Sequence, residues 1–299
     1  MVVVQLNGVV IPRYEGSAGL LLCEHLELSQ LQKDTFATIT VNRNYLHELW
    51  VFGYRNALSC IFPASIFLLL ALSRILPQGL IPRYDFMLAA CLLVQALMVM
   101  TKLETRDELL VICLFHVLGL AMELYKVHMG SWSYPEAAWT KIYGVPLYSG
   151  FMYASVASYM CQAWRRLHLR IKHWPPAWTV WTIAAAIYLN FFTHHYLPDM
   201  RWVLLIIITI LFVRPVVRFM TIKRRSMPVA LSFLLIGLAI WVAENIATYL
   251  GAWKYAYQHK QWQMVSLGKV SSWTLMAIVS YIIVAQLKAV KYGSPDKAL

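Results

Sequence analysis

The sequence predicts an all-α membrane protein, a bundle of about eight transmembrane helices arranged as two similar sets of four. Three observations lead to this fold class. Hydrophobic residues make up 60% of the 299 residues and charged residues only 13%, and the mean hydropathy is +0.58. Soluble proteins are closer to about one-quarter charged. The chain also contains eight apolar runs of spanning length, and one sequence motif occurs twice.

The eight apolar runs are the expected helices, because a hydrocarbon core of roughly 30 Å needs about 20 apolar residues per crossing. They define a transmembrane domain over 51–290, with repeat halves at about 51–170 and 171–290. Residues 1–50 are an N-terminal cytoplasmic or interfacial segment, and 291–299 a cytoplasmic tail. The expected helices lie near 56–76, 84–103, 107–126, 144–163, 174–193, 201–219, 228–250 and 268–290.

The loops that end these helices are of two kinds. The first, third, fifth and seventh helices are followed by loops rich in polar and aromatic residues, at 76–84, 130–136, 194–199 and 251–255. The loops after the other helices are mostly basic. Alternate loops lie on the same side of a membrane, so the polar and aromatic residues are expected to gather at one end of the bundle.

The repeated motif supports the division into four plus four helices. Each residue of its second copy lies 121 positions after its counterpart, and adding 121 to the first four helices places them on the last four. An even number of crossings per half makes the repeat parallel rather than inverted. The first copy is Glu123, Gly130, Trp132 and Tyr134, and the second is Glu244, Gly251, Trp253 and Tyr255.

The basic residues predict the orientation, since cytoplasmic loops retain an excess of Lys and Arg. The side that holds both termini carries most of the 26 basic residues, so both termini are expected in the cytoplasm and the chain in the inner membrane of a bacterium. The net charge of +12 is explained by this bias and by attraction to anionic headgroups. It indicates membrane lipids as partners and no nucleic acid. The opposite side holds Arg74, Arg83, Lys126, Lys141, Arg201, Lys254, Lys260 and Lys269.

Glu123 and Glu244 are the main candidate catalytic residues, because an ionisable side chain inside a membrane span is a functional-site hypothesis by default. Pseudosymmetry would let them face each other between the halves, where two close carboxylates share a proton. The alternative is structural. Each glutamate would hydrogen-bond the following Gly-x-Trp-x-Tyr turn and hold an irregular loop at membrane depth.

His116 is a further catalytic candidate, since it lies seven residues before Glu123 and projects from the same helix face. The two side chains would then share a polar groove. A packed, hydrogen-bonded histidine is the alternative, and the corresponding position in the second half is Gly237, so the repeat does not support a role in chemistry.

His194, His195 and Asp199 are candidate metal ligands at the membrane boundary. Adjacent histidines on a helix point about 100° apart, so one ion can bind both only where the helix ends. The alternative is a hydrogen-bonded cluster at the interface. The spacing matches no established ligand motif, and the sequence identifies no cofactor.

Aromatic residues of the motifs are suited either to the interfacial belt or to the walls of a groove for a lipid or isoprenoid. A groove of this kind would also use polar residues from neighbouring loops. The candidate substrate-binding residues are Trp132, Tyr134, Glu136, Asn190, Trp253 and Tyr255.

Several stretches resemble the bacterial membrane family called domain of unknown function 817, over about residues 45–290. This resemblance implies an architecture and no known chemistry. The residues that carry it are 115–126, 130–136, 145–153, 190–195, 199–202, 243–248 and 269–273.

A more local likeness, over the third and fourth helices, is to multi-pass carotenoid hydratases and cyclases. It rests on a membrane glutamate, Glu123, followed by a Gly-x-Trp-x-Tyr turn and the Val145-Pro-Leu147 helix start. The likeness implies a buried carboxylic acid that protonates a polyene double bond.

Three classes of function follow from these residues. An enzyme would use Glu123 or Glu244 as an acid on a lipid or isoprenoid at an outward-facing site. A transporter would bind a proton or cation between the halves, which favours polar residues along a path and broken helices. A structural protein would use the motifs to order its loops. Polar residues at one end favour the enzyme.

Overall fold

The chain divides into two compact units, Met1–Val51 and Phe52–Leu299, in the computed structural model. In the first unit, β1 (Val3–Leu6) and β2 (Val9–Pro12) form an antiparallel hairpin. A helix over Tyr45–Ser59 continues into α2 (Ile61–Leu72) with a bend of 63°. The structure describes residues 3–6, 9–12, 45–75 and 81–292.

The second unit is mostly helical, and its strands are short. After α2 its helices are α3 (Arg83–Met100), α4 (Arg106–His128), α5 (Gly150–Arg166), α6 (Ala177–Thr193), α7 (Arg201–Leu211), α8 (Val229–Tyr249) and α9 (Lys269–Tyr292). Two 3-10 turns are η1 (Leu147–Ser149) and η2 (Ala256–Gln258). The strands are β3 (Lys141–Ile142), β4 (Val145–Pro146), β5 (Arg170–Lys172), β6 (Val216–Met220) and β7 (Arg224–Pro228).

Local sequence explains where several helices begin. Pro82, Pro176 and Pro228 stand immediately before α3, α6 and α8, where a fixed φ and a missing N–H are tolerated. At the start of α4, Thr105 and Glu108 form a capping box that satisfies two orphan backbone donors.

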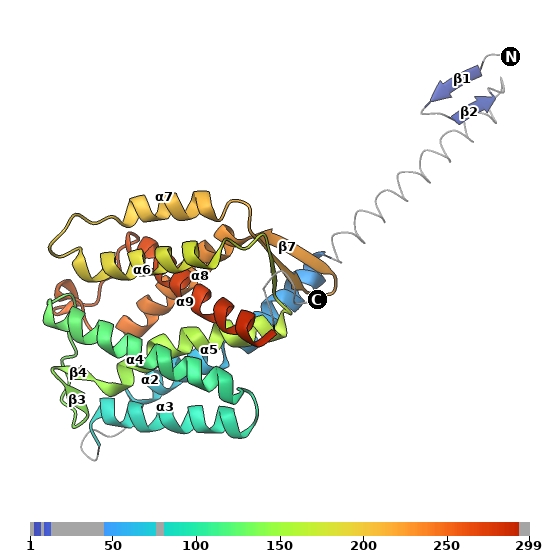
Figure 1. Cartoon of the computed structure of the whole chain (residues 1–299). Helices are drawn as coiled ribbons and strands as arrows, with labels where there is room; N and C mark the ends of the chain where they lie inside the picture. Colours follow the sequence, from blue (N-terminus) through green and yellow to red (C-terminus); the bar gives the residue numbers. More distant parts are fainter. Residues whose placement is uncertain (1–2, 7–8, 13–44, 76–80, 293–299) are drawn as a thin grey trace. The chain divides into compact units, whose positions relative to one another are not determined.

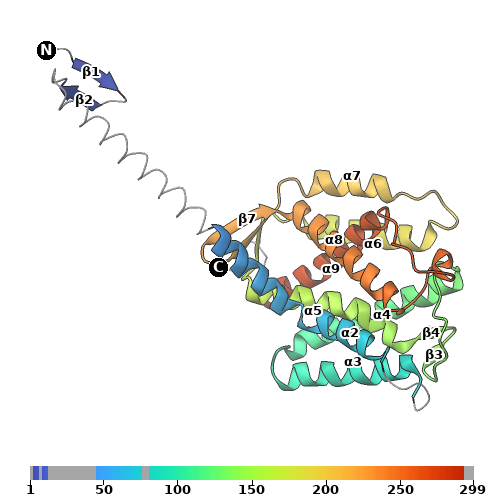
Figure 2. The same ribbon diagram turned by 180° about the vertical axis from the view of Figure 1, so that it is seen from behind.

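The helices from α2 to α9 lie in two groups (Figures 1 and 2). One group is α2 to α5 and the other is α6 to α9, with α3 and α7 on opposite outer sides. The most extensive helix contacts are α4 with α5 and α8 with α9, and α5 packs against α9 between the groups. The buried core therefore runs through both groups.

Four helices are long and apolar enough to cross a membrane: α3, α4, α8 and the Lys269–Gln286 part of α9. A fifth span results if the bent pair that ends with α2 is counted as one, while α6 and α7 are apolar but shorter. Large apolar side chains on these helices are exposed, such as Leu93 at 61% and Val242 at 50%. Apolar helices with apolar outer surfaces indicate a membrane protein.

Each predicted helical segment contains a helix, but the segment at 201–219 is helical only as far as Leu211. Pro215 cannot donate a helical hydrogen bond, and the chain continues as β6. β6 pairs with β5 and β7 in a three-stranded antiparallel sheet that contains basic residues such as Arg170, Arg218 and Arg224. The sequence analysis predicted no strand here.

Candidate functional site

The two motif glutamates are buried near the C-terminal ends of α4 and α8, and each is 3% exposed. Glu123 accepts three hydrogen bonds. Trp132 Nε1 and Tyr134 Oη each donate to its Oε2 at 2.7 Å, and Tyr153 Oη on α5 donates to its Oε1 at 2.8 Å. The carboxylate and the turn that follows α4 are therefore tied together, as the structural interpretation of Glu123 predicted.

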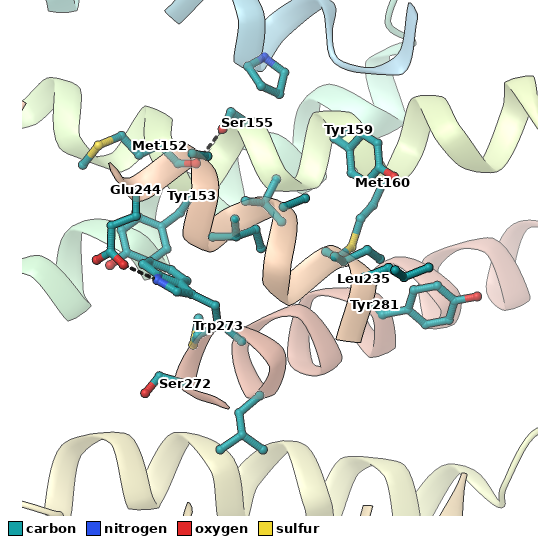
Figure 3. A pocket seen from close by; sticks show the side chains of 18 of the residues that line it. Met152, Tyr153, Ser155, Tyr159, Met160, Leu235, Glu244, Ser272, Trp273 and Tyr281 are labelled. Atoms are coloured by element: carbon teal, nitrogen blue, oxygen red, sulfur yellow. Dashed lines mark hydrogen bonds between the residues drawn. The ribbon is translucent and has the colours of Figure 1, made fainter. Parts of the chain in front are cut away.

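Glu244 has a related but smaller set of donors. Tyr255 Oη donates to its Oε1, and Trp273 Nε1 on α9 donates to its Oε2 at 2.6 Å (Figure 3). Tyr255 corresponds to Tyr134 in the repeat. Trp273 lies 120 positions after Tyr153, so α9 supplies a donor where α5 supplies one to the first glutamate.

Burial and the neighbouring glutamate also affect the tyrosines of the two turns. They raise the pKa of Tyr134 and of Tyr255 well above the ordinary value, so both phenols remain protonated. A protonated phenol can donate the hydrogen bond that each carboxylate accepts.

The two turns meet through equivalent residues. Ser133 and Lys254 form an antiparallel bridge in which each backbone N–H donates to the other's carbonyl at 2.9 Å. These residues are 121 positions apart, so the backbone pairs with its own repeat counterpart. The rings of Trp132 and Tyr255 pack edge to face, with centroids 6.0 Å apart. The sequence predicted that Glu123 and Glu244 face each other, whereas the contact found here joins the turns that follow them.

Glycines allow both helices to end in the same way. Gly130 and Gly251 have φ of 69° and 71°, in the left-handed region that glycine adopts without a Cβ penalty. In each case the residue after the glycine donates back to the helix, from Ser131 to Lys126 and from Ala252 to Ala247, at 2.9 Å.

Arginines from the first group of helices hold the second turn. Arg74 Nε donates to the Leu250 carbonyl at 2.8 Å, and Arg83 Nη1 donates to the Gly251 carbonyl at 3.1 Å. Arg83 also forms an ion pair of 2.8 Å with Glu136. Glu136 therefore has a positioning contact, and it does not line the cavity described next.

A cavity of about 730 Å³ lies among α2, α5, α8 and α9, with contributions from the ends of α4 and α6. Glu123 and Glu244 both line it, with Trp132, Trp253 and Tyr255. Figure 3 shows Tyr153, Glu244 and Trp273 gathered in one part of the cavity. The remaining wall is mostly apolar and includes Met152, Met160, Leu235, Ile236 and Met276.

Lysine residues that the sequence analysis used only for topology also line this cavity. Lys126 is 3% exposed, and its Nζ lies 4.2 Å from the ring centroid of Phe191. Lys269 Nζ lies 4.9 Å from the ring centroid of Tyr255 and 5.7 Å from that of Trp132. Two features of the sequence could have indicated that these lysines line a cavity. Lys126 lies within an apolar helix, and Lys269 lies directly before an apolar span.

Of the candidate metal ligands, His194 and His195 lie together, with ring centroids 4.2 Å apart, whereas Asp199 forms an ion pair with Arg201. His194 and His195 contact Lys126 Nζ, with N to N distances of 3.1 to 3.4 Å, and Asp199 pairs with Arg201 at 2.5 Å. Burial, and then the Lys126 charge, lower the pKa of both histidines, which favours neutral rings that accept from the ammonium group. Among the described residues, no three His, Cys, Asp or Glu side chains are grouped as metal ligands.

Asn190 and His116 differ in their relation to the cavity. Asn190 lines it and donates to Asp199 Oδ1 at 3.3 Å. His116 does not line it, so the groove expected for His116 and Glu123 together is not this cavity. The His116 ring packs against Phe151, with centroids 4.5 Å apart, and a Cβ on Gly150 would lie 2.8 Å from its Nδ1. These contacts indicate a packing role.

Comparison with known proteins identifies the family of the chain. The family model described as "Protein of unknown function (DUF817)" matches residues 48–281. The chain is 60% identical over 248 residues to the "Uncharacterized protein YoaT" of Bacillus subtilis (strain 168), which covers 83% of this chain and 94% of that protein. No solved structure matches significantly. The matched residues include both glutamate motifs, and the chain belongs to the DUF817 family.

Proposed function

We propose that the protein is a membrane enzyme that modifies a lipid or isoprenoid by proton transfer inside the cavity. One observation carries the proposal: two buried carboxylates, each oriented by aromatic donors, line the same end of a largely apolar cavity. Its volume is within the range of about 300–1,000 Å³ typical of small-molecule sites. Basic residues, Lys126, Lys269 and Arg201, line the cavity as well, and most of the remaining wall is apolar.

Glu244 is the better candidate for the proton donor. Among the described contacts, each of its oxygens accepts one hydrogen bond, whereas Glu123 Oε2 accepts two. A carboxyl oxygen has two lone pairs, so both oxygens of Glu244 retain a position for a proton. Glu123 then acts in orienting the site, through Tyr153 on α5 and the aromatic residues of its own turn.

The proposed step is balanced in atoms and charge. Glu244 in its acid form protonates an alkene carbon, and the electron pair of the double bond forms the new C–H bond. The cation is quenched by loss of another proton, by addition of water followed by proton loss, or by attack of an internal alkene followed by proton loss. The released proton restores the acid.

The membrane arrangement belongs to the same proposal. We infer eight spans in a parallel 4+4 repeat, with both termini in the cytoplasm and the carboxylate site at the outer face of the cytoplasmic membrane. The Ser133 to Lys254 bridge, the matched glycine turns and the two similar donor sets support the repeat. The distribution of basic residues supports the orientation.

Lipid mass spectrometry on cells tests the function. Strains would lack the gene, or express the wild type, Glu244→Gln or Glu104→Gln. Glu104 is a matched control because it is also a buried glutamate, 2% exposed and bonded to Gln95 at 2.5 Å, but it does not line the cavity. A lipid that depends on the wild type and on Glu104→Gln, and is lost with Glu244→Gln, is expected. Identical profiles in all strains, with folded protein present, would refute the enzyme.

Lipid transport is a second candidate because of where the cavity extends. Besides the carboxylate end, it is lined by Phe52, Asn56 and the β6 residues Val217 and Phe219, so it reaches the basic sheet. Transport of a labelled lipid across proteoliposomes that contain the wild-type protein tests this reading. Movement that persists in Glu244→Gln would favour transport over catalysis.

A further inference from the structure

We infer that the cavity binds a long apolar chain that ends in a phosphate ester, and that Lys126 and Lys269 bind the phosphate. The inference deepens the proposed function, since it uses the same cavity and names the class of ligand. Both lysines line the end of the cavity that contains Glu123 and Glu244.

Neither lysine forms a salt bridge with an acidic side chain of the described residues. Among the described residues, no carboxylate oxygen lies within 4.0 Å of either Nζ. The contacts of Lys126 are with His194, His195 and the Phe191 ring, and those of Lys269 are with aromatic rings. A buried cation with no paired charge is costly, so a negative group from a ligand would stabilise this end of the cavity.

The pairing of the charged residues that line the cavity also supports a phosphate ligand. Arg201 also lines the cavity, but its charge is paired with Asp199. The oxygens of Glu123 and Glu244 are held by tyrosine and tryptophan donors rather than by the lysines. Among the described residues neither lysine is therefore in a direct ion pair, and a phosphate monoester carries close to two negative charges at neutral pH. Lysine is a common phosphate ligand because it acts as a compact point charge.

The position of the basic residues also supports a phosphate ligand. The basic residues of this chain are scarce at the end predicted to face outward, yet three of them line one cavity there. The positive-inside rule does not explain them, since it disfavours basic residues on that side. Beyond the lysines the wall is apolar, with Met152, Leu235 and Ile236. A charged head against an apolar tunnel matches an amphiphile rather than a free phosphate ion.

A phosphate group held by the lysines would also position the apolar part of the ligand beside Glu244. Lys269 and Glu244 both line the cavity, and Lys269 Nζ lies 4.9 Å from the ring centroid of Tyr255, whose hydroxyl donates to Glu244. A phosphate bound to Lys126 and Lys269 would fix the chain so that a double bond near the head lies beside Glu244. Binding energy of the head would then serve positioning, as expected for groups remote from the reacting atoms.

Equilibrium binding to the purified full-length protein tests the inference, with farnesyl phosphate, the uncharged alcohol farnesol, and inorganic phosphate as probes. Farnesyl phosphate is expected to bind at least about tenfold more tightly than farnesol, because charge-assisted hydrogen bonds to the lysines are lost in the alcohol. Inorganic phosphate is expected to compete weakly. Equal affinities for the phosphate and the alcohol would overturn the inference, and so would inorganic phosphate that binds as tightly as farnesyl phosphate.

Substitutions assign the binding to the lysines. Lys126→Met and Lys269→Met retain an unbranched apolar side chain and are expected to weaken farnesyl phosphate binding about tenfold or more, without weakening farnesol binding. Lys126→Arg keeps the positive charge and should retain affinity. It is the control for a loss of binding that is caused by misfolding. The exposed Lys260 is the control, and Lys260→Met should bind as the wild type does. Unchanged affinity in both cavity variants would overturn the inference.

The two proposals fail in distinguishable ways. Glu244→Gln should still bind farnesyl phosphate, because it leaves both lysines in place. Tight, lysine-dependent binding without any lipid conversion would refute the enzyme and retain the phosphate site. Conversion of an uncharged lipid that is insensitive to both lysine substitutions would refute the phosphate site and retain the enzyme.

Discussion

The two motif glutamates occupy equivalent places but have different surroundings. Glu123 accepts three hydrogen bonds and Glu244 two among the described contacts. Loss of one donor therefore leaves Glu123 well oriented and leaves Glu244 held by Trp273 alone. The two glutamates look equivalent in the repeated motif, but their different hydrogen bonds allow them different roles.

This difference gives a prediction for a matched pair of tyrosines. Tyr255→Phe is expected to lower formation of the lipid product about tenfold, which corresponds to the loss of about one orienting hydrogen bond. Tyr134→Phe is expected to retain most of the product, because Trp132 and Tyr153 still hold Glu123. Product levels normalised to protein amount measure this. An equal loss in both variants would contradict the unequal roles.

The sequence was sufficient to single out the two buried glutamates and their bonds to the following turns, but not their partners on the next helices. A glutamate in an apolar run stands out by composition, and the repeat shows that Trp132 and Tyr134 have counterparts. Tyr153 and Trp273 lie on the following helices, and their contacts depend on how α4 packs on α5 and α8 on α9. Lys126 and Lys269 were missed as site residues because their charge was assigned to topology.

At the scale of elements, glycines determine how closely the paired helices approach. A Cβ on Gly119 of α4 would lie 2.5 Å from the Tyr153 ring of α5, and a Cβ on Gly237 of α8 would lie 2.3 Å from Thr274 Oγ1 of α9. Small residues at these crossings allow the tight packing that is typical of membrane helices. The same approach brings Tyr153 and Trp273 to the glutamates.

The helix-ending glycines allow a second matched prediction. Gly130→Ala is expected to destabilise the protein by about 1–2 kcal/mol, because alanine is strained at positive φ and the added methyl meets no atom within 4 Å. Gly251→Ala should cost about 0.5–1.5 kcal/mol more, since its Cβ would lie 2.2 Å from Arg74 Nη2 and disturb the bond from Arg74 to Leu250.

Thermal unfolding of both glycine variants in the same detergent measures the difference. The expected order of melting temperature is wild type, then Gly130→Ala, then Gly251→Ala. The reverse order of the two variants would show that the contacts of Arg74 do not stabilise the second turn.

The sequence predicted the helices better than it predicted the connections between them. Apolar runs near the length of a membrane span are strong local patterns, and each predicted segment contains a helix. The sheet of β5, β6 and β7 joins segments about 45 residues apart, and such pairing leaves little trace in a short window. Hydropathy alone extended the helix at Arg201 beyond Leu211.

At the scale of the whole molecule, the site lies where the helices α2 to α5 meet the helices α6 to α9. The bridge between Ser133 and Lys254 joins the two turns, and the cavity lies among helices of both groups. From the repeat we expected Glu123 and Glu244 to face each other, and the structure shows the turns that follow them in contact. The cavity was not predictable, since it depends on side chains from α2, α5, α6, α8 and α9 that pack incompletely.

The proposed orientation gives a prediction for reporter fusions. Green fluorescent protein fused after Leu299 should fluoresce, because the C-terminus is expected in the cytoplasm. Alkaline phosphatase fused after Gln261, in the loop before α9, should be active, because that loop is expected outside. Phosphatase activity at the C-terminus and none at Gln261 would invert the topology and place the carboxylate site at the cytoplasmic face.

The most direct test of the account uses purified protein and the lipids of cells that lack the gene. Wild-type protein incubated with this lipid extract is expected to convert one species, over time, into a product of the same mass or heavier by one water. Glu244→Gln should bind lipid and convert none, and Glu104→Gln should convert it as the wild type does. An extract left unchanged by folded wild-type protein would contradict proton-transfer chemistry at this site.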